Sequence, residues 1–325
     1  MKPIYVTEPF LPPLNEYVAH LEKIWGRNVL TNQGPLVNEL EQSIQSYHGI
    51  QANVHCVANG GLGLQIVLKA LGVTGEVVTT PLSYVATTSC PLWEGCSIKF
   101  ADIDPDRLTI DPDAVESVIG PNTEAIVATH VYGNPCDCET LEAISNKHGI
   151  ALIYDAAHAF GVAYQEKSIL EYGDASMVSL HSTKLLHAVE GGFVVASDPA
   201  VAEKVEWMRR FGHQDNGAFH GVGINAKLSE LHAAMGLCNL KYVEKIIRKR
   251  NVICDVYDEA IGDDDALSTI KYRQGATRNY SYYPVIFDSE ASLLAAMARF
   301  NEANIFPRRY FYPDLSTFFS QSAVN

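Results

Sequence analysis

One lysine stands out in the sequence because it lies between two apolar runs. Lys184 follows the β-branched, apolar run 177–180 and precedes a glycine pair at 191–192 that opens the next run, 193–196. Burial would lower the pKa of its ammonium group toward the neutral amine, which can attack a carbonyl and form a Schiff base. An exposed lysine in a strand-to-strand turn is the alternative, and this stretch alone leaves both interpretations open.

The composition is that of an ordinary globular protein with a large core. The chain has 325 residues, of which 47% are apolar and 19% charged, and this length favours two domains. The formal net charge of -14 argues against a general binder of nucleic acid or of anionic membranes, since both need clustered basic surface. We therefore expect neither nucleic acid nor a membrane among its partners.

The sequence shows no sign of export or of a metal centre. Residues 1–17 lack the apolar core of a signal peptide, and no apolar run approaches the length that spans a bilayer, so we expect a cytoplasmic protein. The 7 cysteines are scattered through apolar segments, which suits reduced, buried thiols. Cys136 and Cys138 form the only close pair, and no second Cys/His pair lies at a zinc-site spacing, so we predict no metal site.

Short apolar runs rich in β-branched residues alternate with amphipathic segments up to about residue 198. This alternation indicates an α/β fold with a largely parallel sheet covered by helices on both faces. The last two runs are joined by too short a connection for a crossover helix, so one strand there is expected to be antiparallel. The seven predicted strands span residues 54–58, 76–80, 98–103, 125–131, 151–155, 177–181 and 193–197.

Beyond residue 198 the pattern changes to long helical periodicity, over residues 201–211 and again from 228 to about 261. We expect a second, smaller domain to begin within that second helical run. The predicted division is therefore an N-terminal arm with a large domain in residues 1–240 and a small C-terminal domain in residues 241–325.

The residues that follow each predicted strand are the candidates for a site, because ligands of open parallel sheets bind beyond the carboxyl ends of the strands. After the first strand comes the turn Asn59-Gly60-Gly61-Leu62-Gly63, an N-cap residue with glycines that lead into a helix. Free backbone N–H groups there would favour a phosphate, and plain helix capping is the alternative. The spacing matches neither the GxGxxG fingerprint nor a P-loop.

Three further strand ends carry side chains suited to a heterocyclic ligand. Tyr84 follows the second strand, where its ring could stack on a planar heterocycle or pack as an ordinary core residue. Asp155 ends the fifth strand, and a buried carboxylate needs either a cationic partner, such as a protonated pyridine nitrogen, or N–H donors at a helix N-terminus. Ser179 ends the sixth strand region and offers a hydroxyl to a phosphate.

Phosphate donors, a stacking ring, a carboxylate and a Schiff-base lysine are together the parts that hold pyridoxal 5′-phosphate. Asp155 would keep the pyridine nitrogen protonated, so that the ring withdraws the electrons left when Cα loses its proton. Lys184 would then carry that proton to C4′. These steps make up a transamination, in which the pyridoxamine phosphate form of the cofactor is an intermediate.

The chain resembles the DegT/DnrJ/EryC1/StrS family of sugar-nucleotide aminotransferases, a branch of the aspartate aminotransferase (fold type I) superfamily. The resemblance implies an α/β/α sandwich with a mixed, mostly parallel seven-stranded sheet and a smaller C-terminal domain. The segments that carry it are TNQGPLVNELEQSIQSYHG, VANGGLGLQIVLKALG, TTPLSYVATT, FADIDPDRLTIDP, HVYGNPCD, IYDAAHAFG, SLHSTKLLHAVEGGFVVASD and GINAKLSELHAAMGL.

The resemblance also implies roles for individual residues. Lys184 would form the Schiff base with the cofactor, Asp155 would bind the pyridine nitrogen, and His158 and Tyr84 would lie on opposite faces of the ring. Phosphate contacts would come from the turn at Gly60, Gly61 and Leu62 and from the Ser179 hydroxyl. Asn225 would reach the phosphate bound by a neighbouring subunit, which implies a homodimer with shared sites.

One departure from the family pattern is visible at the phosphate turn. The family usually has Ser-Gly-Thr where this chain has Asn59-Gly60-Gly61. The change removes a threonine hydroxyl and leaves the backbone donors, so we expect weaker phosphate binding that is not abolished.

Within the family, the chain is most similar to enzymes that aminate C4 of a dTDP-4-keto-6-deoxyhexose with glutamate as the amino donor. The product would be a dTDP-4-amino-4,6-dideoxyhexose such as dTDP-viosamine. The segment 306–312, FPRRYFY, resembles the part that approaches the sugar nucleotide, although a surface basic pair is the alternative for its two arginines. The resemblance assigns substrate contacts to His187, Arg308, Arg309 and Tyr310, and it implies a shortened small domain.

Three other functions compete with this one. A related dehydratase that deoxygenates sugars at C3 requires histidine in place of the lysine, so Lys184 argues against it. A 3-keto sugar aminotransferase has the same cofactor residues, and the sequence does not separate it from a 4-aminating enzyme. A non-catalytic regulator or scaffold with this fold would be expected to have lost cofactor residues, and Lys184, Asp155, Tyr84, Ser179 and Asn225 are all present.

Overall fold

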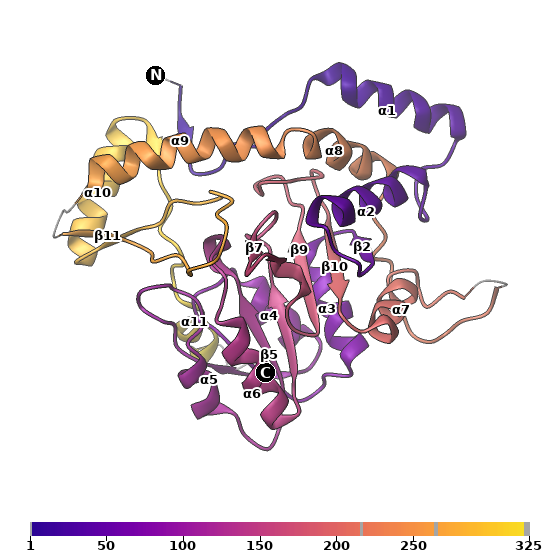
Figure 1. The fold of residues 1–325 in the computed structure, drawn as a ribbon, viewed down its shortest axis with the longest axis horizontal. Helices are drawn as coiled ribbons and strands as arrows, with labels where there is room; N and C mark the ends of the chain where they lie inside the picture. The colour runs from indigo at the N-terminus through magenta and orange to yellow at the C-terminus, as the bar shows by residue number, and fades with distance from the viewer. Residues whose placement is uncertain (1, 215–216, 263–265, 322–325) are drawn as a thin grey trace.

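A computed structural model gives the structure of residues 2–214, 217–262 and 266–321. Its centre is a seven-stranded sheet with the strand order β2-β10-β9-β6-β5-β3-β4 (Figure 1). The strands are β2 (Val54–Val57), β3 (Glu76–Thr79), β4 (Ser97–Phe100), β5 (Thr123–Thr129), β6 (Ala151–Asp155), β9 (Ala175–Ser179) and β10 (Gly192–Ala196).

The seven predicted strands are confirmed, with ends that differ by a few residues. Strand β10 is antiparallel to both of its neighbours, β2 and β9, and the other pairs in this sheet are parallel. The predicted reversal is also confirmed, because the loop between β9 and β10 contains no crossover helix. The carboxyl ends of the parallel strands therefore share one edge of the sheet.

Helices cover both faces of this sheet, as the near-continuous apolar strands predict. One face packs against α2 (Pro35–His48), α6 (Cys138–His148) and α8 (Glu230–Leu240), and the other against α3 (Gly60–Leu71) and α7 (Pro199–Met208). Strand residues alternate between the two cores: in β6, Leu152 and Tyr154 join the first core and Ile153 joins the second.

The predicted helical run from residue 228 to about 261 is two helices, since α8 ends at Leu240 and α9 (Val243–Ile261) begins after two intervening residues. Helix α9 extends away from the sheet toward α10 (Glu290–Glu302) (Figure 1). Strand β11 (Leu267–Thr269) pairs with β12 (Val285–Phe287), and the N-terminal β1 (Ile4–Tyr5) pairs in parallel with β13 (Ile305–Phe306). The division of the chain at residues 240 and 241 stays a prediction.

The remaining elements are short or lie outside the large sheet. They are α1 (Leu14–Arg27), α4 (Ala86–Trp93), α5 (Pro112–Val118), α11 (Leu315–Gln321), the strand pair β7 (Ala163–Tyr164) and β8 (Lys167–Ser168), and the 3-10 turns Val131–Gly133 and Ile169–Glu171. No helix within the described ranges is long and apolar enough to cross a membrane.

Candidate active site

Lys184 lies in the loop between β9 and β10 and is half-buried. Its backbone N–H donates to the carbonyl oxygen of His181 at 2.9 Å, which fixes the turn that carries it. Burial lowers the pKa of Lys184, and the charge of Asp155 opposes this effect more weakly. The amine is therefore shifted toward its neutral, nucleophilic form, and Lys184 is not a fully exposed turn residue.

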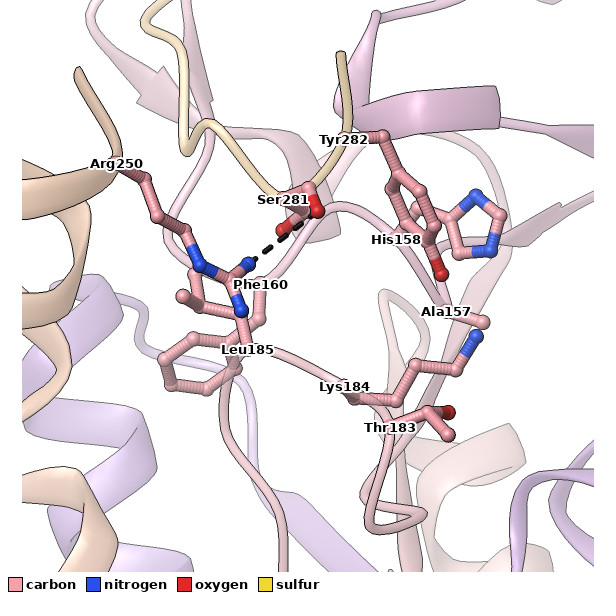
Figure 2. Close-up of a pocket in the computed structure, with 9 residues that line it drawn as sticks. All are labelled: Ala157, His158, Phe160, Thr183, Lys184, Leu185, Arg250, Ser281 and Tyr282. Carbon is pink, nitrogen blue, oxygen red and sulfur yellow. Dashed lines mark hydrogen bonds between the residues drawn. The ribbon is translucent and has the colours of Figure 1, made fainter. Parts of the chain in front are cut away.

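The Lys184 side chain borders a pocket between the carboxyl edge of the sheet and the C-terminal part of the chain (Figure 2). The large-sheet side contributes the loops after β6 and β9, and the C-terminal side contributes α9 and the segment before β12. The lining residues are Ala157, His158, Phe160, Thr183, Lys184, Leu185, Arg250, Ser281 and Tyr282.

Asp155 ends β6 and is only 4% exposed. Its Oδ2 accepts a 2.7 Å hydrogen bond from the hydroxyl of Thr87, and its Oδ1 accepts a 3.0 Å bond from the N–H of Ala157. The residues after Asp155 form a turn and not a helix, so the helix N-cap interpretation is wrong. The carboxylate is instead held at the carboxyl end of the strand, near enough for its charge to act on Lys184.

A chain of buried hydroxyl groups extends from Asp155 into the core. The Ser83 hydroxyl lies 2.7 Å from that of Thr87 and 3.0 Å from that of Thr129, and all three residues are at most 3% exposed. These hydroxyls join α4, the turn after β3 and the end of β5 to the carboxylate. Because they are packed from several sides, the orientation of Asp155 is fixed before any ligand binds.

His158 is a buried, neutral imidazole. Burial, and secondarily the charge of Lys184, hold its pKa well below the usual value. Its Nδ1 accepts the N–H of Tyr132 at 3.1 Å, so the ring proton is on Nε2. The ring centroid lies 4.5 Å from that of Tyr282, which places His158 in the wall of the pocket.

The turn after β2 has the predicted form of a helix N-terminus. Helix α3 begins at Gly60, and Asn59 Oδ1 accepts the N–H of Leu62 at 2.9 Å. A Cβ on Gly60 would lie 3.2 Å from Cβ of Ser179, so the predicted phosphate residues Gly60 and Ser179 are neighbours. The N–H of Leu62 is already bonded within the chain, and a phosphate would have to compete with Asn59 for it.

Tyr84 lies in the turn after β3 and is 62% exposed, so it is not an ordinary core tyrosine. Its carbonyl oxygen accepts the N–H of Thr87 at 3.1 Å, which ties it to the residue that bonds Asp155. An exposed ring at this end of the sheet can stack on a planar ligand.

The structure brings none of the predicted substrate residues into the pocket lining. His187 is 2% exposed, its Nε2 lies 2.7 Å from the carbonyl oxygen of Phe10, and its Nδ1 accepts the N–H of Val189 at 3.3 Å. Both ring nitrogens are therefore used within the chain. His187 holds the N-terminal arm, and the structure does not support the prediction that it binds substrate.

The segment 306–312 lies behind the pocket wall. Arg309 pairs with Glu290 at 2.8 Å and stacks 3.6 Å over the ring of Tyr312, so its guanidinium is already partnered. Arg308 is exposed. The Tyr310 ring packs against that of Tyr282 with 5.8 Å between centroids.

Asn225 is exposed and is not one of the residues that line its own chain's pocket. Its Oδ1 accepts a bond from Lys227 Nζ at 2.6 Å. This location agrees with a side chain that serves a neighbouring subunit, and that role stays a prediction.

Sequence analysis missed four polar lining residues, Thr183, Arg250, Ser281 and Tyr282. Thr183 adjoins Lys184 and follows the sixth predicted strand, so its position after a strand end could have identified it. Arg250 is one of several basic residues in the run IIRKR, and nothing in that run distinguishes the one that faces the pocket.

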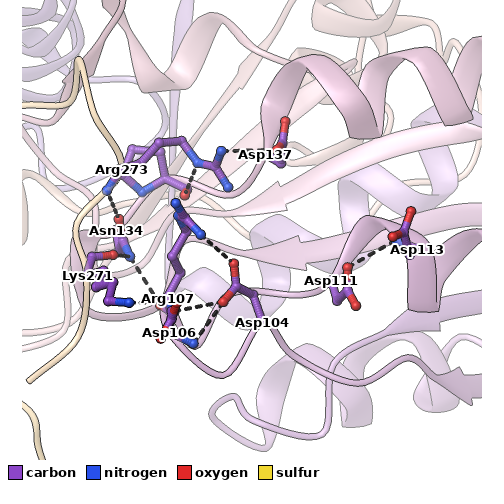
Figure 3. Close-up of polar contacts among 10 residues, drawn as sticks. Asp104, Asp106, Arg107, Asp111, Asp113, Asn134, Asp137, Lys271 and Arg273 are labelled. Carbon is purple, nitrogen blue, oxygen red and sulfur yellow. Dashed lines mark hydrogen bonds and ion pairs between the residues drawn. The ribbon is translucent and has the colours of Figure 1, made fainter. Parts of the chain in front are cut away.

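Polar contacts fasten residues 271–273 to the loops after β4 and β5 (Figure 3). Asn134 donates to the carbonyl oxygens of Arg107 and Lys271, both at 3.1 Å, and accepts the N–H of Arg273 at 3.0 Å. Arg273 also pairs with Asp137 at 3.1 Å. These bonds hold the segment that leads to Ser281 and Tyr282 against the loops after β4 and β5.

The cysteines of this chain lie in its core. All seven cysteines are free and buried, as the sequence predicts, and burial raises the pKa of both Cys136 and Cys138. Among the residues that the structure describes, no group of three or more His, Cys, Asp or Glu side chains could hold a metal ion.

The chain is similar in sequence and in structure to known aminotransferases. The model of the DegT/DnrJ/EryC1/StrS aminotransferase family matches residues 14–323. The dTDP-4-amino-4,6-dideoxy-D-glucose transaminase of Shigella dysenteriae is 39% identical over 320 residues, which are 98% of this chain and 87% of that protein. The protein of the same name from Escherichia coli is 36% identical over 323 residues, or 97% of this chain and 85% of that protein.

Among solved structures, DesI in the presence of its TDP-sugar product superposes with a TM-score of 0.93 and 31% sequence identity. The match covers 100% of this chain and 83% of DesI. A family match over nearly the whole chain, together with these relatives, shows that the protein belongs to the DegT/DnrJ/EryC1/StrS aminotransferase family.

Proposed function

We propose that this protein is a pyridoxal phosphate-dependent transaminase that moves an amino group from glutamate to a nucleotide-linked 4-keto-6-deoxyhexose. The proposed conversion is dTDP-4-keto-6-deoxyglucose to dTDP-4-amino-4,6-dideoxyglucose, the compound that names the two curated relatives. The observation that carries the proposal is a half-buried lysine with a lowered pKa, set beside the neutral His158 and within electrostatic reach of the buried Asp155.

The residues present fit this cofactor. Asp155 offers a buried carboxylate for a protonated ring nitrogen, and its two existing bonds leave acceptor capacity for one more donor. The start of α3 and the Ser179 hydroxyl, which the close approach of Gly60 places together, suit a phosphate. Tyr84 and His158 would cover the two faces of the ring.

When bound, pyridoxal phosphate supplies an electrophilic aldehyde and a ring that accepts electrons. Lys184 contributes an Nζ whose lowered pKa favours the neutral form. It serves first as nucleophile and then as the base that removes a proton from the amino-bearing carbon of the donor. Asp155 contributes a fixed negative charge at the far end of the site. His158 has an uncharged ring, so it adds no second cation that would compete with the ring nitrogen of the cofactor for the Asp155 carboxylate.

We also propose that two copies of the chain share their sites through Asn225. The support is the exposed position of Asn225 outside its own pocket, in a segment where Phe211, Val222 and Ile224 are also exposed. Exposed apolar residues of this kind are typical of a surface that another chain covers.

The decisive experiment is incubation with pyridoxal phosphate, glutamate and a panel of 4-keto and 3-keto nucleotide sugars, followed by NMR of the product. Amination at C4 supports the proposal, and amination at C3 would identify the related 3-keto aminotransferase instead. A second measurement is borohydride reduction with peptide mass spectrometry, which should find the cofactor attached to Lys184 and find no attachment in Lys184→Ala. Absence of turnover with every sugar of the panel would favour the non-catalytic alternative.

A further inference from the structure

Arg250 is a cation in the pocket without an anionic partner. Its Nη1 donates to the carbonyl oxygen of Ser281 at 3.3 Å, and none of the ion pairs among the described residues includes it. Figure 2 shows the guanidinium beside Ser281, Leu185 and Phe160, across the pocket from His158.

Two other withdrawn arginines in this chain have carboxylate partners. Arg209, which is 1% exposed, contacts both Glu41 and Glu206, and Arg273 pairs with Asp137. Taking a guanidinium out of water without an anion is unfavourable, and burial does lower the pKa of Arg250. Arg250, in the middle of α9, faces the pocket without such a partner. Arg278, which also has no ion pair among the described residues, stacks instead on the rings of Tyr272 and Tyr280.

The charge of the pocket selects an anion of limited size. Among the described residues that line it, Lys184 and Arg250 are the only cations, His158 is neutral, and none is acidic. Phe160 and Leu185 form an apolar floor beneath the guanidinium. One planar guanidinium matches one carboxylate through two parallel hydrogen bonds, whereas a diphosphate carries more charge and calls for several donors.

We propose that Arg250 binds a carboxylate of the amino-acid donor and so orients the donor's amino group toward the Lys184 side of the pocket. This inference rests on the proposed transaminase function and names the residue that recognises one of its two substrates. Under this proposal the amino-acid donor binds Arg250. The nucleotide sugar carries its negative charge on a diphosphate and uses other groups of the same pocket.

The test separates the two half-reactions in cofactor-loaded enzyme. Absorbance follows each half-reaction separately. In one, glutamate converts the aldehyde form of the cofactor, and in the other, the keto sugar converts the amine form. Arg250→Met should raise the half-saturating glutamate concentration roughly 10- to 100-fold, as expected for loss of hydrogen bonds to a charged group, and leave that of the keto sugar unchanged. Arg250→Lys keeps the positive charge but lacks the two parallel N–H donors of arginine. Its half-saturating glutamate concentration should lie between those of wild type and Arg250→Met. The matched control is Arg248→Met, an exposed position on the same helix.

Calorimetric titration with succinate, which has carboxylates and no amine, gives a readout that needs no turnover. Wild type and Arg248→Met should bind succinate and Arg250→Met should not. If wild type binds succinate through Arg250 but aminates no sugar, the proposed sugar substrate fails and the carboxylate site stands. Unchanged glutamate saturation in both Arg250 variants, or a loss confined to the keto-sugar half-reaction, would overturn the assignment, and the latter result would place the diphosphate at Arg250.

Discussion

The hydroxyl of Thr87 donates a 2.7 Å hydrogen bond to Oδ2 of Asp155 across 68 residues of sequence. Both groups are buried. The bond fixes one carboxylate oxygen, and little water is present there that could replace the Thr87 hydroxyl as donor. Leaving a buried acceptor short of a donor costs about 1–3 kcal/mol. The Asp155 carboxylate therefore depends on α4 for its position.

We predict that Thr87→Val lowers kcat/KM of the transaminase reaction roughly 10- to 100-fold, the equivalent of that cost, and weakens cofactor binding. Thr87→Ser, which keeps the hydroxyl, should retain most of the activity. The control is Thr88→Val, because the adjacent Thr88 hydroxyl is buried and has no hydrogen-bond partner. Steady-state kinetics that do not distinguish Thr87→Val from Thr88→Val would contradict the role given to this bond.

Asn279 clamps the two sides of the pocket together. Its Nδ2 donates to the carbonyl oxygens of His158 at 2.8 Å and Phe160 at 3.0 Å, and its Oδ1 accepts the N–H of Ser281 at 3.1 Å. We predict that Asn279→Ala lowers the free energy of unfolding by about 1–3 kcal/mol and also raises KM for the donor, since Ser281 and Phe160 line the pocket.

The control for Asn279 is Asn239→Ala, which removes another buried amide that donates to the carbonyl oxygen of His187 at 2.9 Å. It should cost comparable stability in urea unfolding without changing KM, because Asn239 and His187 do not line the pocket. A matched change in KM for both variants would show that the kinetic effect follows from stability alone.

Gly192 is required by the close approach of β10 to the start of α3. A Cβ at this position would lie 2.8 Å from the backbone nitrogen of Gly60, and backbone cannot move aside as a flexible side chain can. Gly192→Ala should displace the α3 N-terminus, destabilise the protein by about 1–3 kcal/mol and weaken pyridoxal phosphate binding. Gly26→Ala, where nothing lies within 4 Å, should leave cofactor affinity unchanged in equilibrium dialysis.

Burial of His48 makes stability depend on pH. Burial lowers the pKa of His48 from 6.5 to about 4. Between these values the unfolded chain binds a proton that the folded chain does not, so protonation favours unfolding. Stability contributed by the neutral ring is complete above pH 6.5 and is lost as the pH falls toward 4.

We therefore predict that the unfolding free energy of wild type decreases from pH 6.5 to 4 more steeply than that of His48→Gln. The two slopes of free energy against pH should differ by about the contribution of one bound proton. Urea titrations at several pH values measure the slope, with the exposed His220→Gln as the comparison. Identical slopes in wild type and His48→Gln would rule out His48 as a source of the dependence.

The sequence by itself determined the features that repeat locally or follow directly from a strand. The seven strands, the reversed strand and the placement of Lys184, Asp155 and Gly60 at the carboxyl edge follow from apolar periodicity and from connection length, which neighbouring residues specify. Strand ends were displaced by a few residues, since side chains beyond the hydrogen-bonded ladder continue the apolar pattern.

Only the tertiary structure decided what surrounds those residues. Thr87 reaches Asp155 across 68 residues and Asn279 reaches His158 across 121, and no local pattern marks either partner. Arg250 faces the pocket although its run of basic residues reads as a solvated helix face, whereas His187, predicted to bind substrate, holds the N-terminal arm. Periodicity tells which residues a helix or strand buries, but which distant groups meet across a pocket depends on how those elements pack.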